Sequence, residues 1–373
     1  MLALDGAKPE PTSILKGRGG IGSLTWSPDG GKIAFVSDRG DHAFVGVLHI
    51  ASKEVVWLGP GVDEDGSPAW SPDGAHVAFV RVPSGSFRGI FRARREDTPW
   101  SIHVGDASSG ETKEIFRADE GVGSAYWPTA SRAQLIWTDG GRIVFPWEKD
   151  GWLHLYSISA SGGGPELLTP GAFEVEETVA DGNEIVFTSN QDDIDRRHIW
   201  RVPAKGGKPK AITRGDGIEW SPAPLSDDNG IAILRSDAQM PARPAIKLGN
   251  GKLGDLAPES MPKGFPSREF VTPEAVTFSA ADGMAIHAQL FMPRGAKAGD
   301  RRPAAIFFHG GSRRQMLLGW HQSSYYHNAY GLNQYLAGQG FVVLSVPVVL
   351  AALFAFPARQ ASPSGASAAG WTP

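Results

Sequence analysis

The sequence predicts a mostly β chain: a β-propeller of about five recognisable blades, followed by a smaller unit in which strands and a helix alternate. Two observations carry this prediction. The motif Trp-Ser-Pro-Asp-Gly occurs at residues 26–30 and again at 70–74, each time just before an apolar strand. The two copies are 44 residues apart. Repeats of about this length, each holding several short strands, are typical of propeller blades. Residues 302–346 then read strand, glycine turn, helix, strand.

The composition fits this fold and excludes several functions. The chain has 373 residues, with 47 glycines and 12 tryptophans, which suits many short strands joined by tight turns. Its net charge is -4 and it has no long basic block, so we expect no nucleic-acid partner. There is no cysteine, no histidine pair at metal-ligand spacing and no phosphate-binding glycine loop. We therefore expect neither a metal nor a cofactor.

The repeated motif has a physical logic. Proline fixes φ, aspartate bonds its own backbone two residues on, and glycine supplies a positive φ. We expect Trp26 and Trp70 to occupy equivalent places and to pack between blades as core. Weaker copies are predicted around Trp127, Gly182 and Trp220, at spacings of about 57, 51 and 42 residues.

The motif and its following strand resemble the TolB-like propeller repeat, which also builds the N-terminal propeller of the prolyl oligopeptidase family of serine peptidases. Residues 150–156 (DGWLHLY) resemble a blade segment of the dipeptidyl peptidase IV-like branch. Residues 276–293 resemble the hairpin that opens the catalytic domain of that family, including its acylaminoacyl-peptidase branch. The resemblance covers about residues 20–346.

This resemblance implies four regions: an N-terminal extension (1–19), the propeller (20–265), the N-terminal part of an α/β-hydrolase domain (266–346) and a low-complexity tail without family features (347–373). The family's propeller has more blades, which leaves open whether the N-terminus is complete. No signal peptide is visible. The compartment is cytoplasmic by default, although relatives are often periplasmic or secreted.

The apolar stretch 304–308 is followed directly by His309-Gly310-Gly311. Together they resemble the oxyanion-loop strand of an α/β-hydrolase. The resemblance implies that backbone N–H groups of Gly310 or Gly311 face the carbonyl under attack, with His309 beside them. The alternative is a plain tight turn. A helix is predicted over 330–337 and a buried strand over 341–346.

Other candidates are weaker. Glu176 and Glu177, in an acidic cluster with Glu174, could hold a substrate's amino group, as paired glutamates do in relatives that cleave dipeptides. The alternative is a solvated strand edge. Residues 191–197 (QDDIDRR) read most simply as a charged loop. His321 and His327 either line the cleft beside the glycine turn or serve in packing.

For an intact relative the resemblance implies hydrolysis of short peptides near their N-terminus by a serine nucleophile. This chain has no Gly-x-Ser-x-Gly; the nearest stretch, 365–369, has no strand before it. We therefore expect the catalytic Ser, Asp and His to be absent and the chain to be inactive. The alternative is a non-catalytic propeller that binds partners. The substrate and the oligomeric state are not predicted.

Resemblance stops abruptly at Pro347, and the tail that follows has no acidic residue. We expect a change of reading frame or gene at this point, with loss of the remaining catalytic domain. The apolar run 341–356 has 16 residues, whereas a membrane-spanning helix needs about 20. We predict a buried strand that continues into an unpaired apolar tail; a membrane tail anchor is the alternative.

Overall fold

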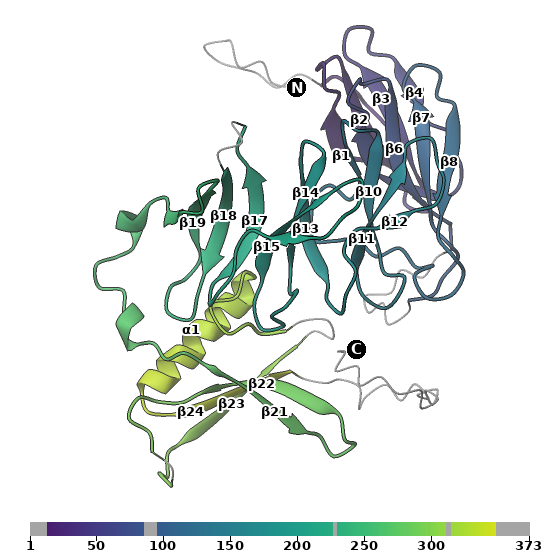
Figure 1. Cartoon of the computed structure of the whole chain (residues 1–373). Helices are drawn as coiled ribbons and strands as arrows, with labels where there is room; N and C mark the ends of the chain where they lie inside the picture. Colours follow the sequence, from purple (N-terminus) through teal and green to yellow (C-terminus); the bar gives the residue numbers. More distant parts are fainter. Residues whose placement is uncertain (1–12, 86–94, 227–229, 298, 311–314, 348–373) are drawn as a thin grey trace. The chain divides into compact units, whose positions relative to one another are not determined.

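The computed structural model describes residues 13–85, 95–226, 230–297, 299–310 and 315–347. The chain divides into two compact units, Met1–Phe187 with Arg201–Lys210, and Thr188–Trp200 with Ala211–Pro373. Short strands dominate both units, and the described residues contain a single α-helix (Figure 1). None of the described helical segments has the length and apolar composition that crossing a bilayer requires.

Twenty strands in sequence order form five four-stranded blades, which confirms the mostly β, propeller-type fold. A single parallel bridge, Ala43 to Glu64, joins the first two blades into one sheet. The strands are β1 (Gly20–Trp26), β2 (Lys32–Asp38), β3 (Ala43–His49), β4 (Val55–Trp57), β5 (Glu64–Trp70), β6 (His76–Val82), β7 (Ser101–Asp106), β8 (Thr112–Arg117), β9 (Ile136–Trp137), β10 (Arg142–Trp147), β11 (His154–Ser159), β12 (Glu166–Leu167), β13 (Val175–Asp181), β14 (Glu184–Ser189), β15 (His198–Pro203), β16 (Lys210–Ala211), β17 (Ile218–Pro224), β18 (Gly230–Ser236), β19 (Arg243–Leu248) and β20 (Leu253–Asp255).

The two clean motifs form the same hydrogen-bonded turn. The Ser71 hydroxyl donates to Asp73 Oδ1 at 2.6 Å and accepts from the His76 N–H at 2.9 Å. The Ser27 hydroxyl does the same with Asp29 and the Lys32 N–H, at 2.6 and 2.9 Å. The serine bond lowers the pKa of each aspartate, since it favours the charged carboxylate. This turn fixes the first hairpin of each blade.

The tryptophans of the two motifs differ in burial, which corrects the prediction that both are core. Trp70 is 8% exposed, and its Nε1–H donates to the Thr25 carbonyl of the first blade at 3.0 Å. Trp26 is 52% exposed. Both occupy the same place in their strands, opposite Ile33 and Val77. Trp70 is covered because it packs against the first blade, and the motif alone does not state which blade has such a neighbour.

The strand predicted after Trp220 is present as β18, but the predicted alignment of this copy on its serine is wrong, because Ser221 lies in a bulge. Strand β5 has a bulge between Gly66 and Ala69, with Ser67 at φ 56°. Strand β17 has its bulge between Trp220 and Ala223, with Ser221 at φ 51°. Ser221 therefore corresponds to Ser67 and not to the serine of the turn.

The turn of the fifth blade begins five residues after Trp220. The Leu225 N–H donates to the Gly230 carbonyl at 3.0 Å, as the Ser71 N–H donates to His76 at 2.9 Å. In the third blade, Trp137 pairs with Ile143 as Trp70 pairs with Val77. Trp137, rather than the predicted Trp127, therefore takes the place of Trp70.

The smaller sheet follows the blades and has the order β21-β22-β24-β23. Its parts are β21 (Glu274–Ser279), β22 (Ala285–Phe291), β23 (Ala304–His309), α1 (Ser324–Gly338) and β24 (Val342–Pro347), preceded by the 3₁₀ turns η1 (Pro258–Ser260) and η2 (Ser267–Glu269). Strands β21 and β22 form an antiparallel hairpin, and β22 pairs with β24. The prediction that residues 276–293 form a hairpin joining this sheet is confirmed.

Strands β23 and β24 are parallel, and α1 connects them. The helix extends six residues further toward the N-terminus than the predicted 330–337. Strand β24 ends at Pro347, where the missing N–H breaks the ladder least. The predicted tail lies outside the described residues from 348 onward, and the predicted domain boundaries stay a prediction.

Among the described residues, one face of this sheet is covered and the other is not. Phe291 and Val343 form a cluster with Tyr330 and Ala337 of α1. On β23, the edge strand, burial alternates, and Ile306 and Phe308 are 59% and 61% exposed. The core of the small sheet therefore lies on the side of α1.

The contrast between the two motif tryptophans gives a matched test. Trp70→Ala should lower the free energy of unfolding by about 3–5 kcal/mol, because it empties a buried site and leaves the Thr25 carbonyl without its donor. Trp26→Ala should cost less than about 1 kcal/mol. Guanidinium unfolding of both variants measures the difference, and equal losses would contradict the assignment.

Candidate functional site

The candidate site begins at the end of β23. His309 is 4% exposed, and its ring meets the ring of Tyr326 edge-on at 5.8 Å. Burial lowers the pKa of the His309 imidazole, so the ring is neutral near pH 7. Gly310 follows on the surface, and its carbonyl accepts a hydrogen bond from the Tyr326 hydroxyl at 2.6 Å. Helix α1 thus fixes the orientation of this turn.

No described atom lies close to the position of a side chain on Gly310. A Cβ built on this glycine would meet no described atom within 4 Å. Packing within the described chain therefore does not require a glycine here, whereas close approach of another molecule to the backbone would. Gly311, the other predicted donor, lies outside the described residues.

The His321 ring packs beside the Tyr326 ring, with 5.4 Å between the ring centroids. Its Nδ1 accepts from the Ser323 N–H at 2.9 Å, so Nε2 carries the proton and donates to the Gln315 carbonyl at 3.1 Å. His327 Nδ1 in turn lies 3.3 Å from the His321 carbonyl. Both histidines thus take part in local packing and hydrogen bonding, and their predicted place in a cleft stays a prediction.

The segment after the turn, residues 315–320, is called the strap below. It belongs to the same compact unit as the fifth blade and the loop before β15. The Leu318 N–H donates to the Asp195 carbonyl at 3.1 Å, and the Trp320 N–H donates to the Asp237 carbonyl at 3.1 Å. The Ser236 hydroxyl donates to the Trp320 carbonyl at 2.6 Å. Blade ends thus hold the strap by its backbone.

Side chains reinforce this attachment. Gln315 Nε2 donates to Asp195 Oδ1 at 3.1 Å, and Leu317 packs with Ile218 and Trp220 of β17. Burial, followed by the charge of Asp193, raises the pKa of the Asp195 carboxyl. The loop 191–197 is therefore more than the charged loop predicted from the sequence. Nothing in the run QDDIDRR distinguishes Asp195 from its neighbours, so no sequence signal indicates this role.

Helix α1 adds a second attachment to the same blade. The Tyr330 hydroxyl donates to the Ala238 carbonyl at 2.8 Å and accepts from Gln334 Nε2 at 2.9 Å. Gln334 also bonds Val271 in both directions, through Oε1 at 2.9 Å and Nε2 at 2.7 Å. Burial raises the pKa of the Tyr330 phenol, so it remains a neutral donor.

Glu176 and Glu177 lie on β13 and are half-buried. The Glu176 carbonyl accepts from the Ala130 N–H at 2.7 Å. Adjacent residues of a strand point to opposite faces, so strand geometry lets only one of the two reach a given ligand. They belong to the first compact unit and His309 to the second. Their role as amino-group ligands stays a prediction.

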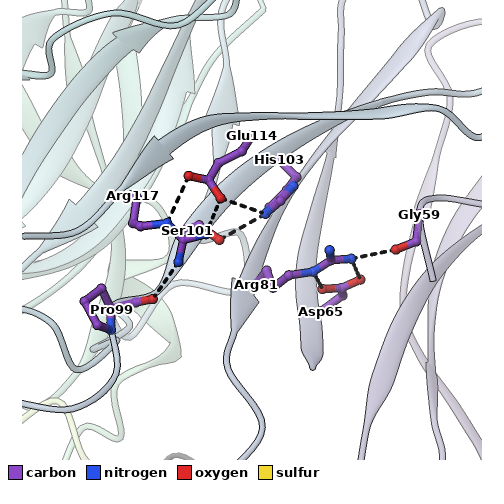
Figure 2. A network of polar contacts seen from close by, with 8 residues as sticks. All are labelled: Gly59, Asp65, Arg81, Pro99, Ser101, His103, Glu114 and Arg117. Atoms are coloured by element: carbon purple, nitrogen blue, oxygen red, sulfur yellow. Dashed lines mark hydrogen bonds and ion pairs between the residues drawn. The ribbon is translucent and has the colours of Figure 1, made fainter. Parts of the chain in front are cut away.

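A polar row crosses the second blade from β5 to β8 (Figure 2). Asp65, Arg81, Ser101 and Arg117 are successive partners in the strand register. Arg81 makes a two-pronged contact with the buried Asp65, at 2.6 and 2.8 Å, and also donates to the Gly59 carbonyl at 2.8 Å. This contact satisfies a carboxylate that would otherwise be costly to bury.

Figure 2 also shows a serine, a histidine and a glutamate together in this row. Ser101 Oγ lies 3.0 Å from His103 Nε2, and Glu114 Oε2 lies 3.8 Å from the same nitrogen. A catalytic triad needs the serine at one ring nitrogen and the acid at the other. Glu114 is moreover paired with Arg117. The group is therefore not a catalytic triad.

The comparisons with known proteins agree with this geometry. Residues 90–240 match the dipeptidyl peptidase IV (DPP IV) N-terminal region. Strands β7 to β18 thus lie in a region that is similar to the propeller of those peptidases. This confirms the resemblance to the prolyl oligopeptidase family that the blade motifs predict.

Solved structures show the same fold at low identity. A puromycin-hydrolysing peptidase of Mycobacterium tuberculosis matches with a TM-score of 0.64 and 17% identity. The match covers 87% of this chain and 49% of the peptidase chain. A putative dipeptidyl aminopeptidase IV of Bacteroides ovatus matches with a TM-score of 0.64 and 16% identity, over 91% of this chain and 55% of the other. A puromycin hydrolase in complex with PGG has 0.65 at 15%, covering 92% and 53%. The chain thus spans about half the length of these proteins.

No cluster of three or more histidine and acidic side chains that could hold a metal ion occurs in the part of the chain that the structure describes.

The strap gives a test of its attachment. A Cβ on Gly319 would lie 2.8 Å from both the Asp237 carbonyl carbon and Ile218 Cδ1. Gly319→Ala should therefore push the strap from the blade and cost about 1–3 kcal/mol of stability. Gly338→Ala is the control, since its Cβ would meet nothing within 4 Å at the end of α1. If thermal melts of the two variants coincide, the strap is not held as described.

His103 gives a test by pH. Burial, followed by the charge of Arg81, lowers its pKa from 6.5 to about 4. The stability that neutral His103 contributes is present above pH 6.5 and is lost as the pH falls toward 4. His103→Gln should therefore flatten the fall in melting temperature between pH 7 and 4. If the His103→Gln variant loses melting temperature over this pH range as steeply as the unsubstituted chain, the assignment is refuted.

Proposed function

We propose that this chain carries the propeller and the oxyanion turn of a serine exopeptidase that acts near the N-terminus of short peptides. The observation that carries the proposal is the end of β23, where Tyr326 holds the carbonyl of Gly310 and no described atom lies close to the position of a side chain on this glycine. The similarity of residues 90–240 to the dipeptidyl peptidase IV N-terminal region supports it. So do the solved peptidases of the same fold, which supply the substrate class by analogy.

The turn has the chemistry that this role requires. In acyl transfer, negative charge develops on the carbonyl oxygen of the substrate, and backbone N–H groups stabilise it. Gly310 and Gly311 are the donors of the proposal, because a glycine backbone lets the substrate approach closely. One such donor is worth about 3 kcal/mol in the transition state. His309, buried and neutral, packs the turn against Tyr326 without adding a charge.

By itself, this chain does not complete the reaction. The sequence holds no Gly-x-Ser-x-Gly elbow to present a nucleophile. The grouping of Ser101, His103 and Glu114 fails as a substitute, because the serine and the glutamate approach the same ring nitrogen. In triad enzymes, loss of the serine costs about 10⁶ in turnover. We therefore propose that the chain as given is inactive.

The second candidate is a propeller that binds peptides without cleaving them. The half-buried Glu176 and Glu177 on β13 favour it, since a carboxylate in such a position pairs with an ammonium group. Binding that depends on the free amino group of the peptide, with no turnover, would support this function.

The activity test uses the purified chain with dipeptidyl and aminoacyl chromogenic substrates and a serine-directed phosphonate. We expect no turnover above background and no labelled serine. Robust turnover that the phosphonate abolishes, with one labelled residue in the peptide map, would overturn the proposal. Ser312 and Ser367, both outside the described residues, would then be examined first.

The binding candidate is tested on the same protein by calorimetry. A peptide with a free amino terminus is compared with its N-acetylated form, and each with the variants Glu176→Gln and Glu177→Gln. Preference for the free amine that one substitution removes would favour the binding module; no binding of either peptide would exclude it.

A further inference from the structure

Three polar side chains are buried between β22, β24 and α1. Gln289 is 3% exposed, and Asn333 and Ser345 are each 1% exposed. Gln289 Oε1, Ser345 Oγ and both amide atoms of Asn333 have no hydrogen-bond partner among the described residues. The Gln289 amide nitrogen donates to the carbonyl of Leu317 in the strap. Buried polar groups are paired in native proteins with few exceptions, so these four atoms point to a bound group.

The strand register brings two of the three side chains together. Gln289 and Ser345 are direct partners across β22 and β24, and Phe291 and Val343 are the next pair along. Phe291 and Val343 pack against Tyr330 and Ala337 of α1. Alternate residues of a strand share a face, so the side chains of Gln289 and Ser345 also lie on the side that α1 covers.

The helix places the third side chain at the same level. Asn333 lies three residues after Tyr330 and four before Ala337, on the same helix face. Because α1 connects two parallel strands, it runs opposite to β24 (Figure 1). Asn333 lies four residues back from Ala337, which is about 6 Å along the helix, and Ser345 lies two residues forward from Val343, about 6.6 Å along the strand. Asn333 therefore faces the pair formed by Gln289 and Ser345.

The hydrogen-bonding capacities of the three groups complement those of one water molecule. Gln289 Oε1 and Asn333 Oδ1 are acceptors, Asn333 Nδ2 is a donor, and the Ser345 hydroxyl can be either. A water molecule donates twice and accepts twice. It can donate to the two amide oxygens and accept from the Asn333 amide nitrogen and the Ser345 hydroxyl.

We propose that Gln289, Asn333 and Ser345 form a binding site for a single internal water molecule in the core of the small sheet. The water links β22 and β24 to α1, and through Gln289 it supports the strap at Leu317. Such waters make about three hydrogen bonds and are costly to remove. The site is independent of the proposed peptidase function, because it is inferred from buried polar atoms of the small sheet and α1 that have no hydrogen-bond partner among the described residues.

The test combines crystallography with ¹⁷O magnetic relaxation dispersion on the full chain. We expect one fully occupied density peak within hydrogen-bond distance of all three side chains. In solution, Asn333→Leu should remove the contribution of one long-lived water. Asn328→Leu, an exposed asparagine on the same helix, should leave the dispersion unchanged.

Ser345→Ala is a smaller change that serves if Asn333→Leu does not fold. It should shorten the residence time of the water while the fold persists, and hydrogen exchange at the amides of residues 315–320 should accelerate. Direct bonds among the three side chains with no density between them would overturn the proposal. An unchanged dispersion in both variants would do the same.

Discussion

The strap of residues 315–320 is the constraint on which the rest of the second unit depends. It is tied at one end to the loop at Asp195 and at the other to the turn after β18 at Asp237. Gly319 makes the fit possible, because any side chain there would strike the Asp237 backbone. The Gly310 turn precedes this segment and α1 follows it. The position of the turn is therefore set by the blade as well as by the sheet.

Much of the fold could be predicted from the sequence, because its information is local. The turn of Ser71 and Asp73 is local, since the hydrogen bonds of these two side chains reach no further along the chain than His76. The hairpin of β21 and β22 is likewise local. The fate of the motif tryptophans is not, since the burial of Trp70 depends on Thr25, 45 residues away. Residues 220–222 are a third Trp-Ser-Pro, but Ser221 lies in a bulge and not in the turn.

The candidate site divides in the same way. His309 and Gly310 follow from the sequence, because a glycine turn after an apolar run is a local pattern. Asp195 does not, because its contact with Gln315 joins residues 120 apart. The polar cluster of Gln289, Asn333 and Ser345 also escapes sequence reasoning. The strand register is needed to bring Gln289 and Ser345 together, and Asn333 is added from the helix that packs on the same face.

In the part of the chain that the structure describes, the small sheet has a core on the side of α1 alone. Phe291, Tyr330 and Val343 fill the side of α1, whereas Ile306 and Phe308 remain exposed on β23. Half a core of this size rarely supports a domain alone.

Attachment to the fifth blade supplies part of the stability that the core of the small sheet lacks. The Tyr330 hydroxyl bonds the Ala238 carbonyl, and Leu317 packs with Trp220. The blade and the sheet accordingly fall in one compact unit. Parallel pairing of β23 with β24 closes a loop of more than thirty residues. Closing this loop costs chain entropy before the contacts between the two strands can stabilise the sheet. Blade hairpins are local by comparison. We therefore infer that the fifth blade forms first and that the strap and α1 then dock on it, bringing β23 and β24 together.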